Sequence, residues 1–319
     1  MTDGTNTSIP IKMESKLSRD LARGTTYSAP FELVHKKKFN LKEGFFLTLV
    51  RTLGLTGAII LMIILAFVVY RGIQVLSWEF ITQSPVESMT KGGIFPVIMG
   101  TVFLTVLCMI VVIPVGVVTA VFLAEYSKPG FILNAVNMSI YTLAGVPSVV
   151  FGLFGLSVFV VTLKFGMSLL AGSITLAIMV LPYLISTSEE AIKAVPYSFR
   201  EASLACGTTK WQTIRKIVLP TALPGILTGA ILGTAKVSGE TAPIMFTAAA
   251  FFTPGIARSV FEPVMALPYH IYVLATAGTH IEKTRPIQYG TALTLIILVL
   301  GMNLLGIIIR RRQRAKKAW

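Results

Sequence analysis

Residues 200–220 read REASLACGTTKWQTIRKIVLP. Glu201-Ala202-Ser203 is followed after three residues by Gly207, and nine residues separate this glycine from Ile217-Val218-Leu219-Pro220. The segment is strongly charged, whereas the stretches on both sides of it are apolar. If those stretches lie in a membrane, this loop is the place where a soluble partner can contact the chain.

The first half of the loop predicts a short helix. Ser198 stands three residues before Glu201, which is the spacing of a capping box at a helix start. We expect a helix from about Phe199 to Cys206, closed by Gly207 in the left-handed conformation that ends many helices. The alternative is an ordinary connecting loop.

The second half predicts another helix after the glycine. Thr209 and Gln212 repeat the capping-box spacing, so a helix should begin there and lead through Ile217 toward the membrane. The loop is then a corner between two helices, with Arg200 and Leu204 expected on the surface of the first one.

Composition indicates a membrane protein. Hydrophobic residues make up 54% of the chain and charged residues 13%, with a mean hydropathy of +0.77, outside the usual balance of soluble domains. Six uncharged stretches are each long enough to cross about 30 Å of hydrocarbon: Thr52–Tyr70, Gly92–Ala124, Pro129–Leu163, Phe165–Ser188, Ile217–Ala235 and Pro286–Ile309. We therefore expect an all-α polytopic protein with six transmembrane helices.

Two features test this count. Gly92–Ala124 and Pro129–Leu163 exceed one crossing, so each should include a turn, a broken helix or an interfacial part. Pro263–Ile281 is also free of Asp, Glu, Lys and Arg, but its prolines and histidines favour an interfacial or re-entrant helix over a seventh span.

The distribution of basic residues predicts orientation. In the six-span arrangement 21 of the 28 Lys and Arg residues lie on one side of the membrane. This bias predicts that both termini and the charged loop are cytoplasmic, in a protein of the plasma (inner) membrane. The net charge of +14 is thus mainly a topological signal. Because it is split among short segments, it does not indicate nucleic-acid binding; membrane lipid is the expected contact of the tails.

These features divide the chain into a cytoplasmic tail (1–45), a permease domain (46–310) and a basic cytoplasmic tail (311–319). The domain contains the charged loop, at about 189–220, and an external loop, at about 253–285. The first span should direct insertion, because the N-terminal tail has no apolar core of the length that a cleavable signal needs.

The sequence offers no catalytic centre. Cys108 falls in a span and Cys206 in the loop, so a disulfide is not expected, and the scattered His35, His270 and His280 show no metal-ligand spacing. The chain has no Gly-Lys dipeptide and hence no Walker A phosphate loop. We expect a conduit that is not an enzyme and binds no metal or cofactor itself.

Intramembrane charges follow the fifth apolar stretch. Gly225, Gly229 and Gly233 recur every four residues, which lets another helix approach closely, and Lys236 and Glu240 follow near the same face. The two charges form a structural ion pair, or Glu240 reaches the headgroups, or the pair guides and gates a passing anion. Proline at 243 disturbs the turn carrying Glu240, which is typical of a transport site.

The charged loop resembles the EAA loop of the membrane subunits of ABC importers, in which a coupling helix docks into a cleft of the ATP-hydrolysing subunit. Ser203 departs from the second alanine of that pattern. The matching positions, with the two expected surface residues, are the ATPase-coupling candidates: Arg200, Glu201, Ala202, Leu204, Gly207, Ile217, Leu219 and Pro220.

Two further segments are similar to the phosphate importer permeases of the PstA type. They are Gly239-Glu240-Thr241-Ala242-Pro243 and its continuation to Ala248, and Gly145-Val146-Pro147-Ser148 with Phe151-Gly152. The resemblance covers the chain from about Arg71 onward. It implies the type I, MetI-like permease fold, a PstC-like permease partner, a PstB-like ATPase dimer that binds ATP and Mg²⁺, and a PstS-like phosphate-binding protein.

The resemblance also implies residues of the substrate path or gate: Lys236, Glu240, Thr241, Glu189 and Ser186. Lys236 stands where relatives often have arginine. Ser186 departs from a common arginine, and a hydroxyl cannot grip phosphate in the bidentate manner of a guanidinium. The alternatives for Glu189 and Glu190 are solvated residues at a helix end, an inward-facing gate that discourages return of the anion, or a salt bridge to Lys193.

Other functions stay open from the sequence. A permease for another oxyanion, such as sulfate or molybdate, or for an organic phosphate explains the EAA-like loop equally well. A secondary transporter or channel explains the intramembrane charges but not the loop. A purely structural membrane subunit is a third alternative.

Overall fold

The computed structural model describes residues 41–86, 89, 91–253, 255–277 and 281–315. The expected N-terminal tail lies outside the described residues up to residue 40, and residues 41–45 already belong to a helix. Part of the basic C-terminal tail, from residue 316, also lies outside them.

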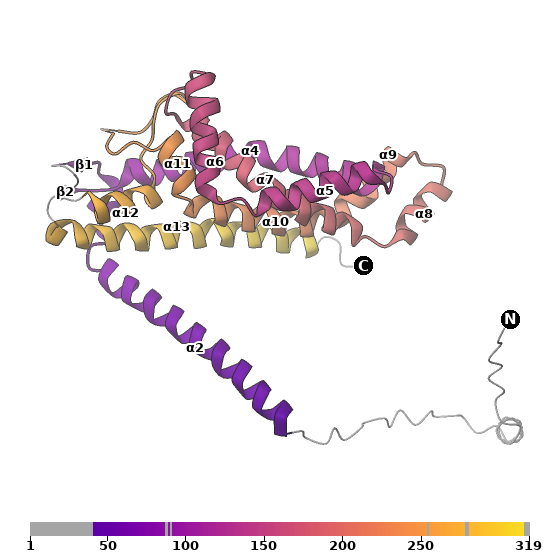
Figure 1. Cartoon of the computed structure of the whole chain (residues 1–319), viewed down its shortest axis with the longest axis horizontal. Coiled ribbons are helices and arrows are strands. Elements are labelled where there is room, and N and C mark those ends of the chain that lie inside the picture. The colour runs from indigo at the N-terminus through magenta and orange to yellow at the C-terminus, as the bar shows by residue number, and fades with distance from the viewer. Residues whose placement is uncertain (1–40, 87–88, 90, 254, 278–280, 316–319) are drawn as a thin grey trace, which may run out of the picture. The chain divides into compact units, whose positions relative to one another are not determined.

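The described chain is mostly helical (Figure 1). Its first half contains α2 (Leu41–Gly72), α3 (Trp78–Thr82), α4 (Phe95–Val121), the π-helical turn η1 (Phe122–Tyr126), α5 (Phe131–Ala144), α6 (Ser148–Gly155) and the π-helical segment η2 (Leu156–Thr162). Two strands of two residues each form an antiparallel pair, β1 (Pro85–Val86) and β2 (Lys91–Gly92), with Pro85 opposite Gly92.

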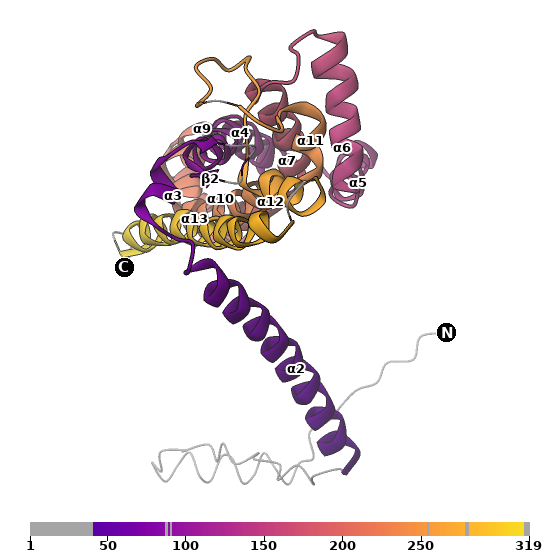
Figure 2. The same cartoon turned by 90° about the vertical axis from the view of Figure 1, so that its left-hand side faces the viewer.

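The second half contains α7 (Leu169–Lys193), α8 (Tyr197–Ala205), α9 (Lys210–Thr213), the π-helical turn η3 (Ile214–Val218), α10 (Leu219–Gly239), α11 (Ala242–Thr247), α12 (Leu267–Thr276) and α13 (Ile281–Ala315). By its internal contacts the chain divides between Ile59 and Ile60, within α2. All packing discussed below lies within the second unit, which Figure 2 shows nearly end-on.

Five described helices are long and apolar enough to cross a membrane, or six if the bent pair α5 and α6–η2 counts as one. The bend between the two members of that pair is 98°, and α6 stands across the direction of its neighbours in Figure 1. The break expected within Pro129–Leu163 is therefore confirmed. Of the features expected within Gly92–Ala124, neither a turn nor a broken helix is formed from Phe95 onward, because α4 and η1 form one continuous helix from Phe95 to Tyr126.

The helix α7 lies at the centre of the bundle. In its most apolar 18-residue window 67% of the residues are buried, more than in any other described span. Leu176, Val180 and Leu184 of α7 pack with Cys108 and Val112 of α4 in the main core cluster. Cys108 is thus a buried free thiol, whereas Cys206 is an exposed one.

The short helix α12 has ten residues and packs against α13 and α4. It is not among the helices that could span a membrane, in keeping with the expectation of a re-entrant or external helix. Its His270 is buried, with Nδ1 3.4 Å from Thr291 Oγ1. Burial lowers the pKa of His270 to about 4, so the ring is neutral at physiological pH.

The repeated glycines of α10 differ in how closely they approach α7. A Cβ atom at Gly225 would lie 2.6 Å from Ala191 Cβ, and one at Gly229 would lie 2.2 Å from Thr187 Oγ1. A Cβ atom at Gly233 would lie 3.6 Å from its nearest neighbour, which is an ordinary contact. Two of the three glycines predicted for helix packing therefore permit a close approach, and the third does not require glycine.

This difference predicts unequal effects of adding a methyl group. We expect Gly225→Ala to lower stability by about 1–3 kcal/mol through overpacking against the rigid Ala191 methyl. Gly233→Ala should be neutral or stabilising by up to about 1 kcal/mol through helix propensity. Thermal unfolding of the detergent-purified chains checks this, and equal melting temperatures for the two variants would contradict the packing.

Candidate functional site

The charged loop folds as a corner between the ends of α7 and α10. The first short helix, α8, begins at Tyr197 and ends at Ala205, close to the predicted range. The predicted capping box of Ser198 and Glu201 is wrong, because Pro196 occupies the N-cap and no side chain caps the helix. Proline with its fixed φ sets the entry to the helix instead.

The turn after α8 follows the prediction. Gly207 has φ of +78°, and its N–H donates to the Leu204 carbonyl at 2.9 Å. No atom lies within 4 Å of the position of an added Cβ, so the left-handed backbone alone calls for glycine. The capping box of Thr209 and Gln212 is confirmed in both directions at the start of α9.

Three hydroxyl groups hold the inside of the corner. Ser203 Oγ lies 2.7 Å from Thr208 Oγ1 and 2.9 Å from Thr213 Oγ1, and the two threonine oxygens are 3.1 Å apart. Thr208 also donates to the Ser203 carbonyl at 2.8 Å. The serine that replaces the second alanine of the EAA pattern therefore has buried partners that an alanine would lack.

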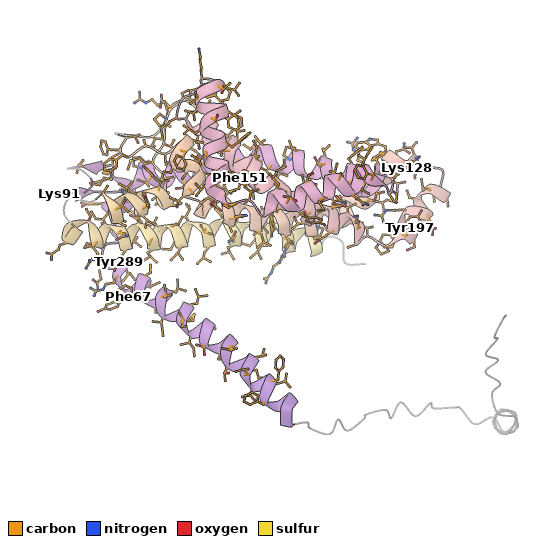
Figure 3. The ribbon with its side chains drawn as sticks, viewed as in Figure 1. Phe67, Lys91, Lys128, Phe151, Tyr197 and Tyr289 are labelled. Atoms are coloured by element: carbon orange, nitrogen blue, oxygen red, sulfur yellow. The ribbon has the colours of Figure 1, made fainter. Side chains whose placement is uncertain are left out.

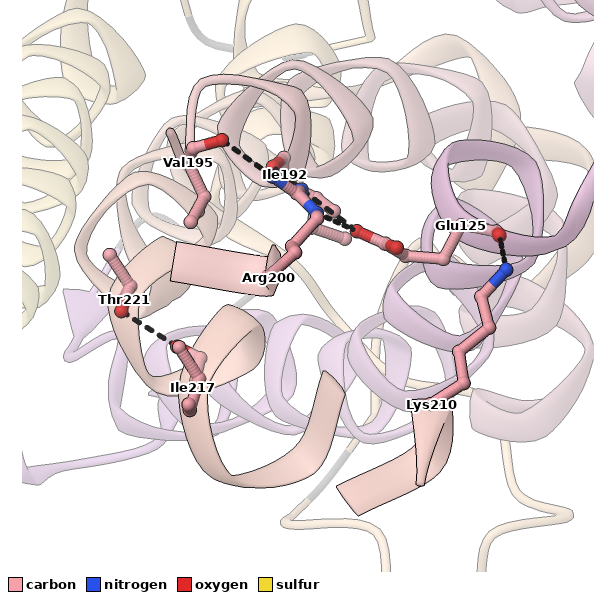
Figure 4. A network of polar contacts seen from close by, with 7 residues as sticks. All are labelled: Glu125, Ile192, Val195, Arg200, Lys210, Ile217 and Thr221. Carbon is pink, nitrogen blue, oxygen red and sulfur yellow. Dashed lines mark hydrogen bonds and ion pairs between the residues drawn. The ribbon is translucent and has the colours of Figure 1, made fainter. Parts of the chain in front are cut away.

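Arg200 joins the corner to the bundle (Figure 4). Its Nε and Nη2 donate to Glu125 Oε1 at 3.0 and 2.8 Å, and its Nη groups also donate to the carbonyls of Ile192 and Val195 at 2.9 and 2.6 Å. The side chains of Arg200 and Glu125 are 14% and 9% exposed. The expectation of Arg200 on the surface of α8 is thus wrong, since the buried carboxylate of η1 draws it inward.

Lys210 makes a second connection to the same turn. Its Nζ donates to the Glu125 carbonyl and lies 4.7 Å from the centre of the Tyr126 ring. Both short helices of the corner are therefore fastened to η1, the end of α4. Sequence reasoning missed Glu125 and Tyr126, and the available signal was a single carboxylate placed just where the apolar stretch Gly92–Ala124 ends.

Several large apolar side chains of the corner are exposed. Leu204 is 48% exposed, as predicted, and Glu201 and Ala202 are exposed beside it. Three aromatic side chains of the corner are exposed as well: Tyr197, Phe199 and Trp211. Figure 3 places Tyr197 and Lys128 at the same end of the bundle, opposite to Lys91. A pocket of about 640 Å³ lies behind α8, bounded by Glu125, Lys193 and Arg200. The other coupling candidates, Ile217, Leu219 and Pro220, are partly buried where η3 enters α10.

At the opposite end of α10 the backbone leaves the helix. Glu240 is extended, with φ of −77° and ψ of 133°, and α11 starts after Thr241 with Pro243 in its first turn. The break is packed against α6: a Cβ atom at Gly152 would lie 2.9 Å from the Ala242 carbonyl oxygen. Two segments that the sequence singled out separately, the one around Gly152 and the one around Glu240, are therefore in direct contact.

The charged residues near this break do not pair with each other. Lys236 is exposed and Glu240 half-buried, and among the described residues no ion pair involves either one. Lys236 is exposed, whereas Gly229 and Gly233 of the same helix are buried. The local ion pair considered from the sequence is not formed.

The two candidates on α7 lie at a different level of the bundle. Glu189 is buried, and Lys193 Nζ donates to its Oε1 at 2.6 Å, which is the salt bridge considered from the sequence. Ser186 Oγ donates to the Pro182 carbonyl at 3.1 Å. Thr187 faces Gly229, and Lys236 follows that glycine by seven residues, about 10 Å further along α10. The structure does not bring the five path candidates together.

Five described membrane-length helices and one bent helix pair, with an exposed corner at one end and a broken helix at the other, are the architecture of a multi-pass membrane protein. A family model, described as the binding-protein-dependent transport system inner membrane component, matches residues 113–318. The chain belongs to this family of multi-pass membrane permeases.

Curated relatives cover most of the chain. The phosphate transport system permease protein PstA of Mycobacterium leprae (strain TN) is 35% identical over 88% of this chain and 91% of the relative. The probable phosphate transport system permease protein PstA of Methanocaldococcus jannaschii is 33% identical over 84% of this chain and 93% of the relative. The probable ABC transporter permease protein YqgI of Bacillus subtilis (strain 168) is 33% identical over 79% and 90%.

Solved structures share the fold. A bacterial alginate ABC transporter, in complex with a periplasmic protein bound to an alginate pentasaccharide, includes a chain with a TM-score of 0.63 and 16% identity, covering 85% of this chain and 95% of that one. The MetNI methionine ABC transporter, in an inward-facing conformation, includes a chain with a TM-score of 0.55 and 21% identity, covering 67% of this chain and 93% of that one. The predicted type I, MetI-like permease fold is confirmed.

The Arg200–Glu125 ion pair yields a test of the corner. We expect a double-mutant cycle with Glu125→Ala and Arg200→Ala to give a coupling energy of about 2 kcal/mol, because the pair is largely buried and bonded through two N–H groups. Glu201→Ala, at an exposed acidic neighbour, should change stability by no more than about 0.5 kcal/mol. Chemical unfolding in detergent measures these differences, and a coupling energy near zero would contradict the pairing.

Proposed function

We propose that the chain is the transmembrane permease subunit of an ATP-driven importer of inorganic phosphate. The observation that carries the proposal is the match to relatives named as phosphate transport permeases, at 33–35% identity over 84–88% of this chain. The contact between the segments around Gly152 and Glu240 supports it, because both segments resemble that subfamily and meet at the broken helix.

The corner supports coupling to a soluble ATPase. The exposed Leu204 of α8 and the exposed aromatic side chains of the corner provide apolar surface for docking. Arg200 fastens α8 both to η1 and to the last carbonyls of α7. A displacement of α8 would therefore be passed to α4 and α7 together, and ATP would shift the transporter between states only if the two states dock the partner differently.

The broken helix supports a substrate path for an anion. Lys236 presents an ammonium group near a point where the backbone is not helical, and interrupted helices with free backbone groups are common at transport sites. Thr241 and Glu240 lie at the break itself, where Glu240 would orient the anion or gate its passage. Ser186 and Glu189, at the level nearer the corner, would act at a separate inner position.

The complex would contain a second, PstC-like permease, two PstB-like ATPase subunits that bind ATP and Mg²⁺, and a PstS-like phosphate-binding protein. The permease itself would bind no cofactor and catalyse no reaction. From the bias of Lys and Arg we infer that the corner and both termini face the cytoplasm and that the chain lies in the plasma (inner) membrane. The described basic residues at the corner and at 310–312 agree with that orientation.

Uptake in proteoliposomes tests the function. With the partner subunits and ATP, labelled phosphate should accumulate, and sulfate or molybdate in excess should not compete. Gly207→Pro should abolish this uptake, because proline cannot adopt φ of +78° and lacks the N–H that bonds Leu204. Gly166→Pro, which imposes the same conflict at a glycine with φ of +66° outside the corner, should retain ATP-coupled uptake.

The alternatives have their own outcomes in this assay. Uptake without ATP would indicate a secondary transporter or channel. Competition by another oxyanion would move the substrate assignment while leaving the ATP coupling intact. Equal loss of uptake in both proline variants would remove the argument that the corner couples uptake to ATP.

The role of Lys236 is tested by changing its charge. We expect Lys236→Met to lower phosphate uptake about tenfold or more, since a charged hydrogen bond contributes about 1.5–3 kcal/mol, and Lys236→Arg to preserve most of it. Lys128→Met removes an exposed lysine at the corner end of the bundle and should have little effect. Initial uptake rates over a range of phosphate concentrations provide the measurement, and normal uptake by Lys236→Met would exclude the lysine from the path.

A further inference from the structure

An apolar groove of about 610 Å³ runs between α4, α10 and α13, apart from both the corner and the broken helix. Its walls are formed mainly by branched aliphatic side chains, among them Ile110, Ile113, Leu227, Ile231, Leu305 and Ile309. All three helices are of membrane-spanning length. The groove therefore lies within the membrane region, with a volume typical of sites for a single small ligand, about 300–1,000 Å³.

Basic side chains stand at one end of this groove. Ile309 and Leu227 line it, and the next residues in the chain, Arg310 and Thr228, are joined by a hydrogen bond from Arg310 Nη1 to Thr228 Oγ1 at 3.0 Å. Arg310 is half-buried. This bond uses one of the five N–H donors of the guanidinium, and it is the only hydrogen bond of Arg310 found within the described residues.

Two more arginines continue the positive charge. Arg311 and Arg312 are exposed and follow at the same end of α13, which is the end nearer the corner. Among the described residues no ion pair involves any of the three arginines. The apolar slot thus extends toward the end of α13 that carries these three arginines.

We propose that this groove is a binding site for an anionic phospholipid, with an acyl chain in the slot and the phosphate at Arg310. Apolar walls favour a hydrocarbon chain, and the free N–H donors of a guanidinium match a phosphate group in a bidentate manner. Basic residues beside a span attract anionic headgroups. The tether from Thr228 holds Arg310 at the mouth of the slot.

The alternative occupant is a helix of another subunit, and the shape of the groove disfavours it. Close approach of a second helix requires small residues on the facing surface. Gly306 is such a residue, but its open side is already filled by α10: an added Cβ would lie 2.4 Å from Ile231 Cγ1. What remains open is a slot between large branched side chains, which suits a flexible chain of methylene groups.

Photo-crosslinking identifies the occupant. A photo-reactive amino acid is placed at Ile110, which lines the groove and is 62% exposed. The full-length chain, with the subunits that co-purify with it, is reconstituted in equal parts of phosphatidylglycerol and phosphatidylethanolamine. After illumination, mass spectrometry should find the chain crosslinked to phospholipid, with phosphatidylglycerol in excess.

Arginine variants test the headgroup contact. Arg310→Gln should reduce the excess of phosphatidylglycerol about fivefold, and the combined Arg311→Gln and Arg312→Gln, at exposed positions, provides a second variant that leaves the tether to Thr228 intact. Arg215→Gln removes an exposed arginine of η3 that does not line the groove and should leave the ratio unchanged.

Two results would overturn the proposal. Crosslinking of Ile110 to another protein chain would show that a partner helix covers the groove. An unchanged ratio of crosslinked phosphatidylglycerol to phosphatidylethanolamine in the variants of Arg310, Arg311 and Arg312 would show unselective contact with the surrounding bilayer.

Discussion

Close packing around α7 is the constraint on which the other helices depend. Glycines of three different helices face it: an added Cβ would lie 3.0 Å from Leu184 at Gly116 of α4, 2.2 Å from Thr175 at Gly155 of α6, and 2.6 Å from Ala191 at Gly225 of α10. Between lipid-exposed helices the hydrophobic effect gives little attraction, so contacts of this kind supply much of the association energy. The central helix then fixes where the corner and the broken helix lie.

The two ends of the bundle differ in structure. At the corner, the chain leaves the membrane and builds a polar interior from Ser203, Thr208 and Thr213, with the Arg200–Glu125 pair as its anchor. At the other end, the backbone interrupts its helical bonding inside the protein, where the break at Glu240 is covered by α6. Irregular backbone at membrane depth is tolerated where protein surrounds it or where it lines a cavity.

Several features of the site could be predicted because they depend on neighbours in the chain. The capping box of Thr209 and the left-handed Gly207 are set by residues within a few positions, and the bend in Pro129–Leu163 follows from a stretch too long for one crossing. The same reasoning failed at Ser198, where Pro196 had already fixed the entry of α8. It also failed at Arg200, because the acceptor that draws this side chain inward lies 75 residues earlier.

The sequence by itself determined the membrane class, the approximate spans and the two-helix corner, since apolar length, local capping and glycine at positive φ are properties of short segments. Only the tertiary structure decided which distant residues meet: Arg200 with Glu125, Gly152 with Ala242, and Arg310 with Thr228 across 82 positions. These pairings depend on how the helices pack around α7. A pattern along one helix specifies which face is small or apolar, but not which partner helix covers that face.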